Sequence, residues 1–258
     1  MQVLIHDFEV MGTVFRFTFA QADRELALSL LPLAQQILVE ADNTFSTYKP
    51  ESEVSQIREE QLSLAQASFD VRMIFRDCNI WSVKTEGAFS AVDPAGKWDP
   101  SGLVKAWAAQ SVMNLFEANG LTNCSLNAGG DICLGVDASA ELNRIGIAKP
   151  ISIATTGLTA GWVLDLGGTP FRAVATSGSA ERGEHIWGKQ SGLTQVTVVA
   201  KNLISADIWA TSLFARGLDL LPVMVESGLE AMLIFEDDSL EITPGFMELE
   251  VSKELLRK

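Results

Sequence analysis

The sequence predicts one α+β domain with a mainly antiparallel sheet core and flanking helices. Helical patterns come early, strand patterns fill the middle and a pair of helices comes late, an order that favours α+β over regular alternation of strands and helices. The 258 residues, of which 47% are hydrophobic, are enough for one large core. No repeat, proline-rich linker or block of like charge divides the chain. We therefore expect a single domain over residues 1–258, with a polar tail from about residue 251.

The elements of the first half are predicted from the spacing of apolar residues. Phenylalanines that alternate with polar residues predict a strand over about residues 10–19 with one buried face. Leucines at helical spacing predict a helix over about residues 23–43, in which Pro32 would produce a kink. A second apolar stripe predicts a helix over about residues 69–84, and Gly87 is expected to end it.

A third helix has the clearest start signal in the sequence. Asp99 stands where an N-cap carboxylate accepts backbone N–H groups, and Pro100 suits the first helical position. This helix is expected to run to Gly120. A strand, an Ala-Gly-Gly-Asp turn and a second strand are then expected over residues 124–136.

The second half of the chain contains short apolar runs between turn residues, a pattern typical of strands. These runs predict strands over about residues 144–148, 151–155, 162–166, 171–175, 195–200, 231–235 and 240–243. Two further helices are expected over about residues 206–216 and 218–227, before the last two of these strands.

The charge and the scarcity of soft metal ligands exclude several classes of function. The 33 acidic and 19 basic residues give a net charge of −14, which argues against nucleic acid or an anionic membrane surface as the main partner. The chain has only two histidines, and its three cysteines show no CxxC spacing. These counts argue against a closed zinc site and against an iron–sulfur cluster. A bound metal is therefore expected to be a hard cation on oxygen ligands.

The N-terminal residues indicate where the protein is expected to act. Residues 1–13 lack the basic stretch, apolar run and cleavage site of a signal peptide, and no stretch approaches the roughly 20 apolar residues of a membrane span. The odd number of cysteines fits a reducing compartment. We expect a cytoplasmic protein.

Four segments carry glycine, carboxylate and hydroxyl residues at the ends of expected elements, where functional groups tend to lie. They are residues 98–105, 127–131, 175–178 and 205–211. In the first, Asp99 is either a simple helix cap or part of a helix N-terminus that holds an anion, with Lys105 supplying a cation. In the second, the glycine pair is expected to form a tight turn that Asp131 stabilises through its side chain, and the alternative is a close approach of the backbone to a ligand.

The other two segments offer phosphate and metal ligands. Thr176-Ser177-Gly178 is either a plain strand exit or a nest of N–H groups with two hydroxyls for a phosphate. Asp207 and Thr211 are four residues apart and share one face of a helix, and their apolar neighbours indicate that this face is not simply solvated. A carboxylate and a hydroxyl are suitable ligands for Mg²⁺, which leaves positions for substrate phosphate.

In order and in residue type, these segments resemble the family of FAD:protein FMN transferases, the ApbE type. The matching pieces are Met11-Gly12-Thr13, residues 45–55, Gly87-Ala88-Phe89-Ser90, residues 99–105, residues 127–131, residues 175–186 and Ala206-Asp207 with Thr211. The resemblance implies a T-fold-like α+β core. It also implies an enzyme that uses Mg²⁺ to move FMN from FAD onto a threonine or serine of an acceptor protein, with release of AMP.

The same resemblance implies a role for each matching residue. The FAD site would contain Met11, Tyr48, Ala88, Phe89, Ser90, Asp99, Lys105, Thr176, Ser177, Gly178 and Ile186. Tyr48 would lie against an aromatic ring of the cofactor. Asp207 and Thr211 would ligate Mg²⁺ together with a main-chain oxygen near Gly102, and His185 would act as general base on the acceptor hydroxyl.

Two other functions would use the same pocket. An FAD pyrophosphatase would deliver water instead of the acceptor hydroxyl and release FMN and AMP. A non-catalytic FAD-binding protein would store or hand over the flavin. The loop after Ile186, residues 187–190, is shorter than is usual in the family, and a change there that disables His185 would favour the carrier.

Overall fold

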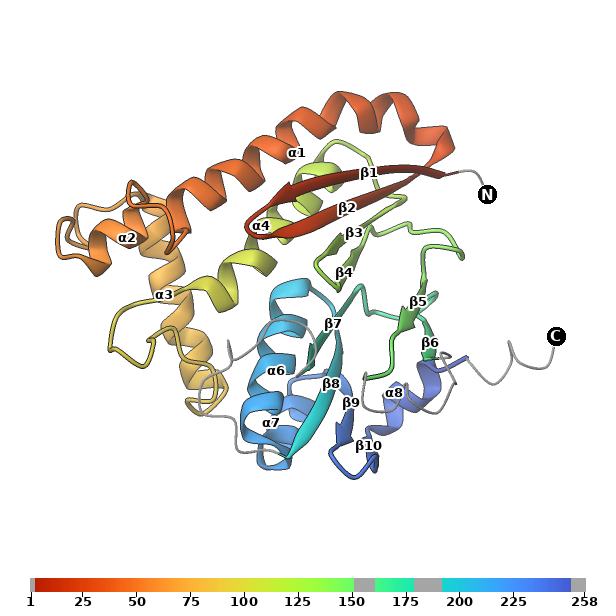
Figure 1. Cartoon of the computed structure of the whole chain (residues 1–258). Helices are drawn as coiled ribbons and strands as arrows, with labels where there is room; N and C mark the ends of the chain where they lie inside the picture. The colour runs from red at the N-terminus through yellow and green to blue at the C-terminus, as the bar shows by residue number, and fades with distance from the viewer. Residues whose placement is uncertain (1–2, 151–160, 179–191, 252–258) are drawn as a thin grey trace.

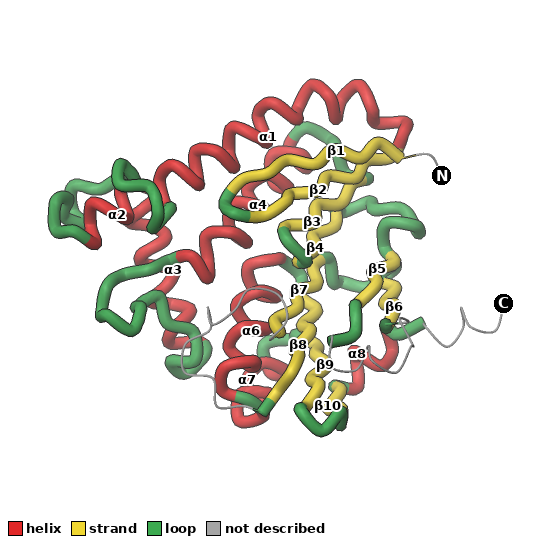
Figure 2. The backbone as a smooth tube through the Cα atoms, viewed as in Figure 1, coloured by secondary structure: helices red, strands yellow, loops and turns green. Residues whose placement is uncertain are grey.

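The computed structural model describes residues 3–150, 161–178 and 192–251. Its centre is an eight-stranded antiparallel sheet with the strand order β1-β2-β3-β4-β7-β8-β9-β10, and β5 pairs with β6 in a separate hairpin (Figure 1, Figure 2). The strands are β1 (Val3–Val10), β2 (Thr13–Ala20), β3 (Cys124–Ala128), β4 (Asp131–Leu134), β5 (Arg144–Ile147), β6 (Trp162–Asp165), β7 (Ala173–Gly178), β8 (Leu193–Ala200), β9 (Glu230–Phe235) and β10 (Leu240–Ile242).

Helices cover both faces of this sheet unequally. The helices are α1 (Arg24–Phe45), α2 (Glu53–Arg58), α3 (Phe69–Lys84), α4 (Ser101–Ala118), α6 (Leu203–Arg216), α7 (Leu221–Glu226) and α8 (Pro244–Leu249), with 3₁₀ turns η1 (Gln21–Asp23) and η2 (Leu218–Leu220). The helices α1, α3, α4 and α6 share one apolar core with one face of the sheet. The β5–β6 hairpin and α8 form a smaller apolar cluster with the other face (Figure 1).

The burial of each strand explains its sequence pattern. The phenylalanines of β2 alternate with less buried residues because only one face of this strand meets the helices. Among them, Phe17 and Phe19 lie against Phe116 of α4, with ring centroids 6.1 and 5.5 Å apart. By contrast, β8 is buried along almost its whole length, because Val196 and Val198 belong to the core on one side of the sheet and Val199 to the cluster on the other.

Most of the predicted elements are confirmed, as is the α+β class with an antiparallel sheet. The helix over residues 69–84 is α3, and the strand, turn and strand over residues 124–136 are β3 and β4. The first predicted helix is α1, a single helix that contains Pro32. The predicted helix over residues 218–227 divides into η2 and α7. The apolar runs also correctly located β5, β6, β8, β9, β10 and α6, and β7 is displaced to Ala173–Gly178.

The strand predicted over residues 10–19 is β2, which begins only at Thr13 because residues 11 and 12 form a turn; the strand β1 on the other side of this turn was not predicted. The strands β1 and β2 are joined by Met11 and Gly12, which have φ of 55° and 67°. Such a two-residue turn favours Asn-Gly or Asp-Gly, so Met-Gly gives little turn signal. His6 also interrupts the apolar alternation of β1, and its Nε2 lies 2.8 Å from Gln35 Nε2 of α1.

The predicted start of the third helix needs a smaller correction. The helix α4 begins at Ser101, with Pro100 in the N-cap position. Asp99 lies one residue earlier, and its Oδ1 accepts a hydrogen bond of 2.9 Å from Ser101 N. The short helices α2 and α8 were not predicted, because six residues cannot show a clear helical period. The strand predicted over residues 151–155 lies outside the described residues.

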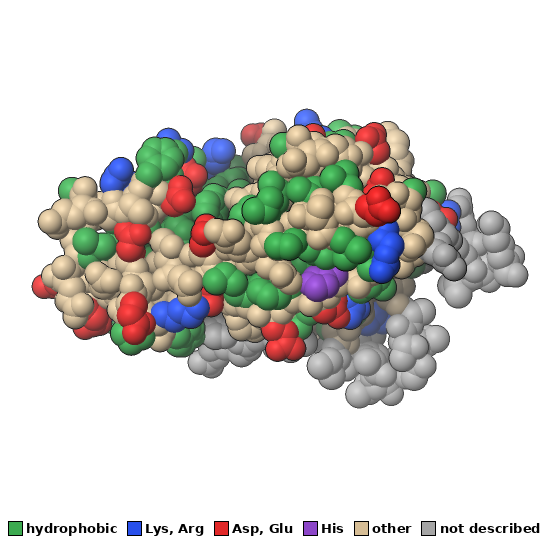
Figure 3. All heavy atoms as spheres, turned by 90° about the horizontal axis from the view of Figure 1, so that it is seen from above, with side chains coloured by type: hydrophobic (Ala, Val, Ile, Leu, Met, Phe, Trp, Pro, Cys, Tyr) green, Lys and Arg blue, Asp and Glu red, His purple; other side chains and the backbone are tan. Residues whose placement is uncertain are grey.

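The surface is mixed in charge. On the face seen in Figure 3, the basic side chains of the described residues lie singly or in small groups among acidic ones. Within the described part of the chain, no helix is long and apolar enough to span a membrane.

Candidate functional site

One cavity of about 1120 Å³ brings the predicted site residues together. It is formed by the first turns of α4, the first half of α6, the β3–β4 turn and β7, with the loop after α1 and the segment after α3. The lining includes each predicted site residue that the structure describes: Met11, Tyr48, Ala88, Phe89, Ser90, Asp99, Gly102, Lys105, Thr176, Ser177, Gly178, Asp207 and Thr211. His185 and Ile186 lie outside the described residues, so their roles stay predictions.

A lysine between two carboxylates forms the floor of the cavity, which we define as Lys105, Asp131, Ser177, Asp207 and Thr211. The Nζ of Lys105 forms a close ion pair with Asp131 Oδ2 and lies 3.5 Å from Asp207 Oδ2. Both carboxylates are buried, and the lysine side chain is largely enclosed. Charges taken out of water need such partners, so this arrangement is organised before any ligand arrives.

Asp131 has a different role from the predicted one. The turn between β3 and β4 is held by Asn127, whose Oδ1 accepts from Gly130 N at 2.8 Å. Asp131 instead points into the cavity, where Oδ2 pairs with Lys105 and Oδ1 accepts from Thr176 N at 3.1 Å. It therefore connects α4 to β7. The two glycines before it hide this role in the sequence, because they make a turn the simplest explanation.

The hydroxyls of the floor come from β7 and α6. Ser177 Oγ and Thr211 Oγ1 lie 3.2 Å apart, and Thr176 Oγ1 lies 3.0 Å from Thr197 Oγ1. The helix α6 presents Asp207 and Thr211 to the cavity because Leu203, Ile208, Trp209 and Leu213 are buried in the core. Asn202 caps this helix by accepting from Ser205 N at 2.9 Å.

The floor supplies the kind of donors that a hard divalent cation prefers. The donors are the Asp207 carboxylate and the hydroxyls of Thr211 and Ser177, without thiolate or imidazole among the described residues of the cavity. The described residues contain no group of three or more His, Cys, Asp and Glu side chains that could enclose a metal alone. One carboxylate with hydroxyls fits Mg²⁺, which keeps other positions for water or substrate phosphate.

The cysteines are not part of this chemistry. Burial raises the pKa of each thiol, Cys78, Cys124 and Cys133, to about 12. Such thiols stay protonated near neutral pH and are poor nucleophiles and poor metal ligands. Their burial within the core therefore has a packing role.

The cavity also has a rim, which we define as its apolar and aromatic lining residues Met11, Tyr48, Ala88 and Phe89 together with the loop that follows Phe89. Tyr48, in the loop after α1, is 88% exposed, and its backbone N donates to Ser46 Oγ at 3.2 Å. Phe89, which also lines the cavity, is buried, and its N donates to Thr85 Oγ1 at 2.9 Å. Gly102 allows a close approach here, because a Cβ at this position would lie 3.3 Å from the Phe89 ring. The rim thus offers aromatic and apolar surface above a polar floor.

Solved structures of flavin transferases and of a further ApbE protein share the fold of this chain. The flavin transferase ApbE of Vibrio cholerae gives a TM-score of 0.78 at 19% identity, covering 96% of this chain and 99% of that chain. The ApbE protein of Thermotoga maritima gives 0.79 at 16% identity, with coverage of 97% and 100%. The apo flavinyl transferase ApbE of Pseudomonas stutzeri gives 0.73 at 18% identity, with coverage of 97% and 98%. At these identities the likeness concerns the fold.

Family membership follows from a sequence match. No curated protein matches the chain. The model of the ApbE family matches residues 90–233, which is more than half of the 258 residues. The matched span contains Asp99, Lys105, Asp131, Asp207 and Thr211. This chain therefore belongs to the ApbE family.

Proposed function

We propose that this chain transfers FMN from FAD to a threonine or serine hydroxyl of an acceptor protein, with Mg²⁺ and with release of AMP. Membership of the ApbE family supports the proposal, as do flavin transferases of the same fold. The observation that carries it is the floor of the cavity, where Lys105 pairs with two buried carboxylates and the hydroxyls of Ser177 and Thr211 lie 3.2 Å apart.

The proposed reaction explains why such a floor is useful. The acceptor oxygen forms a bond to the FMN-side phosphorus, the bond from that phosphorus to the bridging oxygen breaks, and AMP leaves with this oxygen. Negative charge on the diphosphate must be stabilised during the transfer, and the Lys105 ammonium supplies a fixed positive charge at the floor. The proton of the acceptor hydroxyl must pass to a base, for which we propose His185.

Two of the floor residues would hold the metal. Asp207 and Thr211, with a main-chain oxygen near Gly102, are the proposed Mg²⁺ ligands. When bound, Mg²⁺ neutralises diphosphate charge and fixes the geometry of the substrate. Asp131 does not belong to this set of ligands, and its ion pair with Lys105 holds the lysine in place. Local positive charge is needed because the chain carries a net charge of −14, which repels an anionic nucleotide at long range.

The rim suits the flavin and the remainder of the nucleotide. We propose that the exposed Tyr48 ring lies against an aromatic ring of FAD, because stacking removes apolar surface of both partners from water. Met11, Ala88 and Phe89 provide further apolar lining. Asp99 and the hydroxyls of Ser90 and Thr176 provide hydrogen-bonding groups.

The proposed activity is tested by incubating the protein with FAD, Mg²⁺ and synthetic peptides that each contain a central threonine or serine. Covalent fluorescent flavin on a peptide, with an equal amount of AMP, is the expected result. Free FMN with AMP would instead identify an FAD pyrophosphatase, and unchanged FAD would identify a carrier. Mass spectrometry of the peptides and chromatography of the nucleotides separate these three outcomes.

Replacing the proposed metal ligand gives a sharper test. Asp207→Asn should lower the rate of AMP release by more than about a hundredfold, because the amide loses the charge that the cation requires. Asp219→Asn is the matched control, since Asp219 is an exposed carboxylate in η2 just after the same helix. Full turnover by the Asp207→Asn variant would contradict the metal assignment.

A further inference from the structure

One side of the cavity is formed by a tight loop, residues 90–99, which we call the wall loop. Val92 and Trp98 form an antiparallel bridge across it, and Asp99 N donates to Ala91 O at 2.8 Å. The lining residues that it contributes are Ser90, Val92, Asp93, Pro94 and Asp99. The position of the wall loop therefore sets the width of the cavity on this side.

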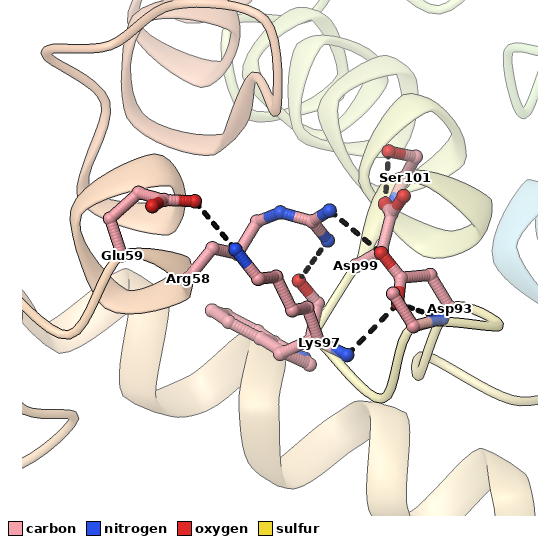
Figure 4. A network of polar contacts seen from close by, with 8 residues as sticks. Arg58, Glu59, Asp93, Lys97, Asp99 and Ser101 are labelled. Carbon is pink, nitrogen blue, oxygen red and sulfur yellow. Dashed lines mark hydrogen bonds and ion pairs between the residues drawn. The ribbon is translucent and has the colours of Figure 1, made fainter.

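Arg58, the last residue of α2, holds the wall loop at two points (Figure 4). Its Nη2 donates to Asp93 Oδ2 at 2.7 Å, and its Nη1 donates to the carbonyl of Trp98 at 2.8 Å. The side chains of Arg58 and Asp93 are only 18% and 11% exposed. The planar guanidinium binds Asp93 and Trp98, on the two sides of the loop, at the same time. The single ammonium group of a lysine is less suited to such a double contact.

Asp93 makes this contact rigid. While its Oδ2 binds Arg58, its Oδ1 accepts from Ala95 N and Lys97 N, both at 2.9 Å. One carboxylate therefore closes the turn of the wall loop and anchors it to α2. Movement of Arg58 would be transmitted directly to the loop backbone.

The helix α2 also holds the loop that carries Tyr48. The hydroxyls of Ser52 and Ser55 donate to the carbonyl of Ser46 at 2.5 and 3.1 Å. Two residues later, Tyr48 also lines the cavity. One end of α2 is therefore fixed to the Tyr48 side, and its other end, through Arg58, to the wall loop.

We infer that Arg58 is a positioning residue for the flavin nucleotide, an inference that rests on the proposed function. Arg58 sets the separation between the Tyr48 loop and the wall loop. It also orients Asp99, which directly follows the Trp98 carbonyl and accepts from Ser101 N at the start of α4 (Figure 4). Its effect falls on nucleotide affinity, because the floor that supports the transfer step is built from α4, β4, β7 and α6.

The test is the dissociation constant of FAD, measured with Mg²⁺ by the quenching of FAD fluorescence, alongside KM and kcat. Arg58→Ala should raise both the dissociation constant and KM by about tenfold and leave kcat within about twofold. Arg58→Lys should recover part of the affinity, because an ammonium retains the charge but not the fork. A purely structural role would lower the melting temperature without changing the affinity of the folded protein.

The wall loop also provides a matched control. Lys97 pairs with Glu59 at 2.6 Å, next to the Arg58–Asp93 pair, but these side chains are 42% and 61% exposed. Lys97→Ala should therefore leave FAD affinity unchanged. A dissociation constant for Arg58→Ala within twofold of wild type would overturn the inference. If the Arg58→Ala protein does not fold, the Arg58→Lys protein provides the test instead. A dissociation constant of Arg58→Lys equal to that of wild type would then overturn the inference. Failure of the wild-type protein itself to bind FAD would instead reject the proposed function.

Discussion

The floor and the rim of the cavity are built in different ways. The floor places Lys105 between two buried carboxylates on elements of the main core. The rim carries the exposed Tyr48 and a wall loop that depends on a few contacts from α2. A floor made by the core is fixed when the protein folds. A rim made by loops can change its spacing without loss of the fold, so the two regions should respond differently to substitution.

The largest effect is expected at the floor. Lys105→Met should lower the free energy of unfolding by about 3 kcal/mol, because Asp131 and Asp207 then lose the charge between them. It should also lower the rate of AMP release by more than about a hundredfold. Urea unfolding and the release assay measure the two effects, with the exposed lysine variant Lys201→Met as control. A stable and active Lys105→Met protein would remove the distinction between floor and rim.

An intermediate effect is expected at the exposed rim. Tyr48→Ala should raise KM for FAD about fivefold through loss of one stacked ring. Because the side chain is 88% exposed, the melting temperature should stay within about 1 °C of wild type. Tyr48→Phe retains the ring and should bind FAD as the wild type does. An equal KM for all three proteins would show that the rim does not contact the flavin.

The smallest effect is expected for the stability of the wall loop at low pH. Two hydrogen bonds hold the pKa of Asp93 below its ordinary value. The bond from Lys97 N has the larger effect, and the bond from the Arg58 side chain has a smaller one. A lowered carboxyl pKa stabilises the fold above the unfolded-state pKa, and this contribution is lost as pH falls through the folded-state pKa. The difference in melting temperature between wild type and Asp93→Asn should therefore shrink between about pH 4 and pH 2. A difference that stays constant over this range would show that the Asp93 charge does not stabilise the loop.

The same contrast separates what sequence reasoning could predict from what it missed. The long helices and buried strands have clear apolar periods, and the predicted floor residues Lys105, Asp207 and Thr211 lie beside motifs at the starts of two helices. Arg58 has no such local signal, and Asp131 lies in a segment whose glycines favour a simple turn. Arg58 meets Asp93 across 35 residues of chain, and Asp131 meets Lys105 across 26. Side-chain pairs of this kind depend on tertiary packing, which local patterns do not contain.

We propose that the floor binds a divalent cation together with FAD. The most direct measurement is a fluorescence titration of wild-type protein with FAD, once with Mg²⁺ and once with excess EDTA. Much tighter binding with Mg²⁺, and loss of this difference in Asp207→Asn, is the result we predict. Equal affinity under both conditions would contradict the claim.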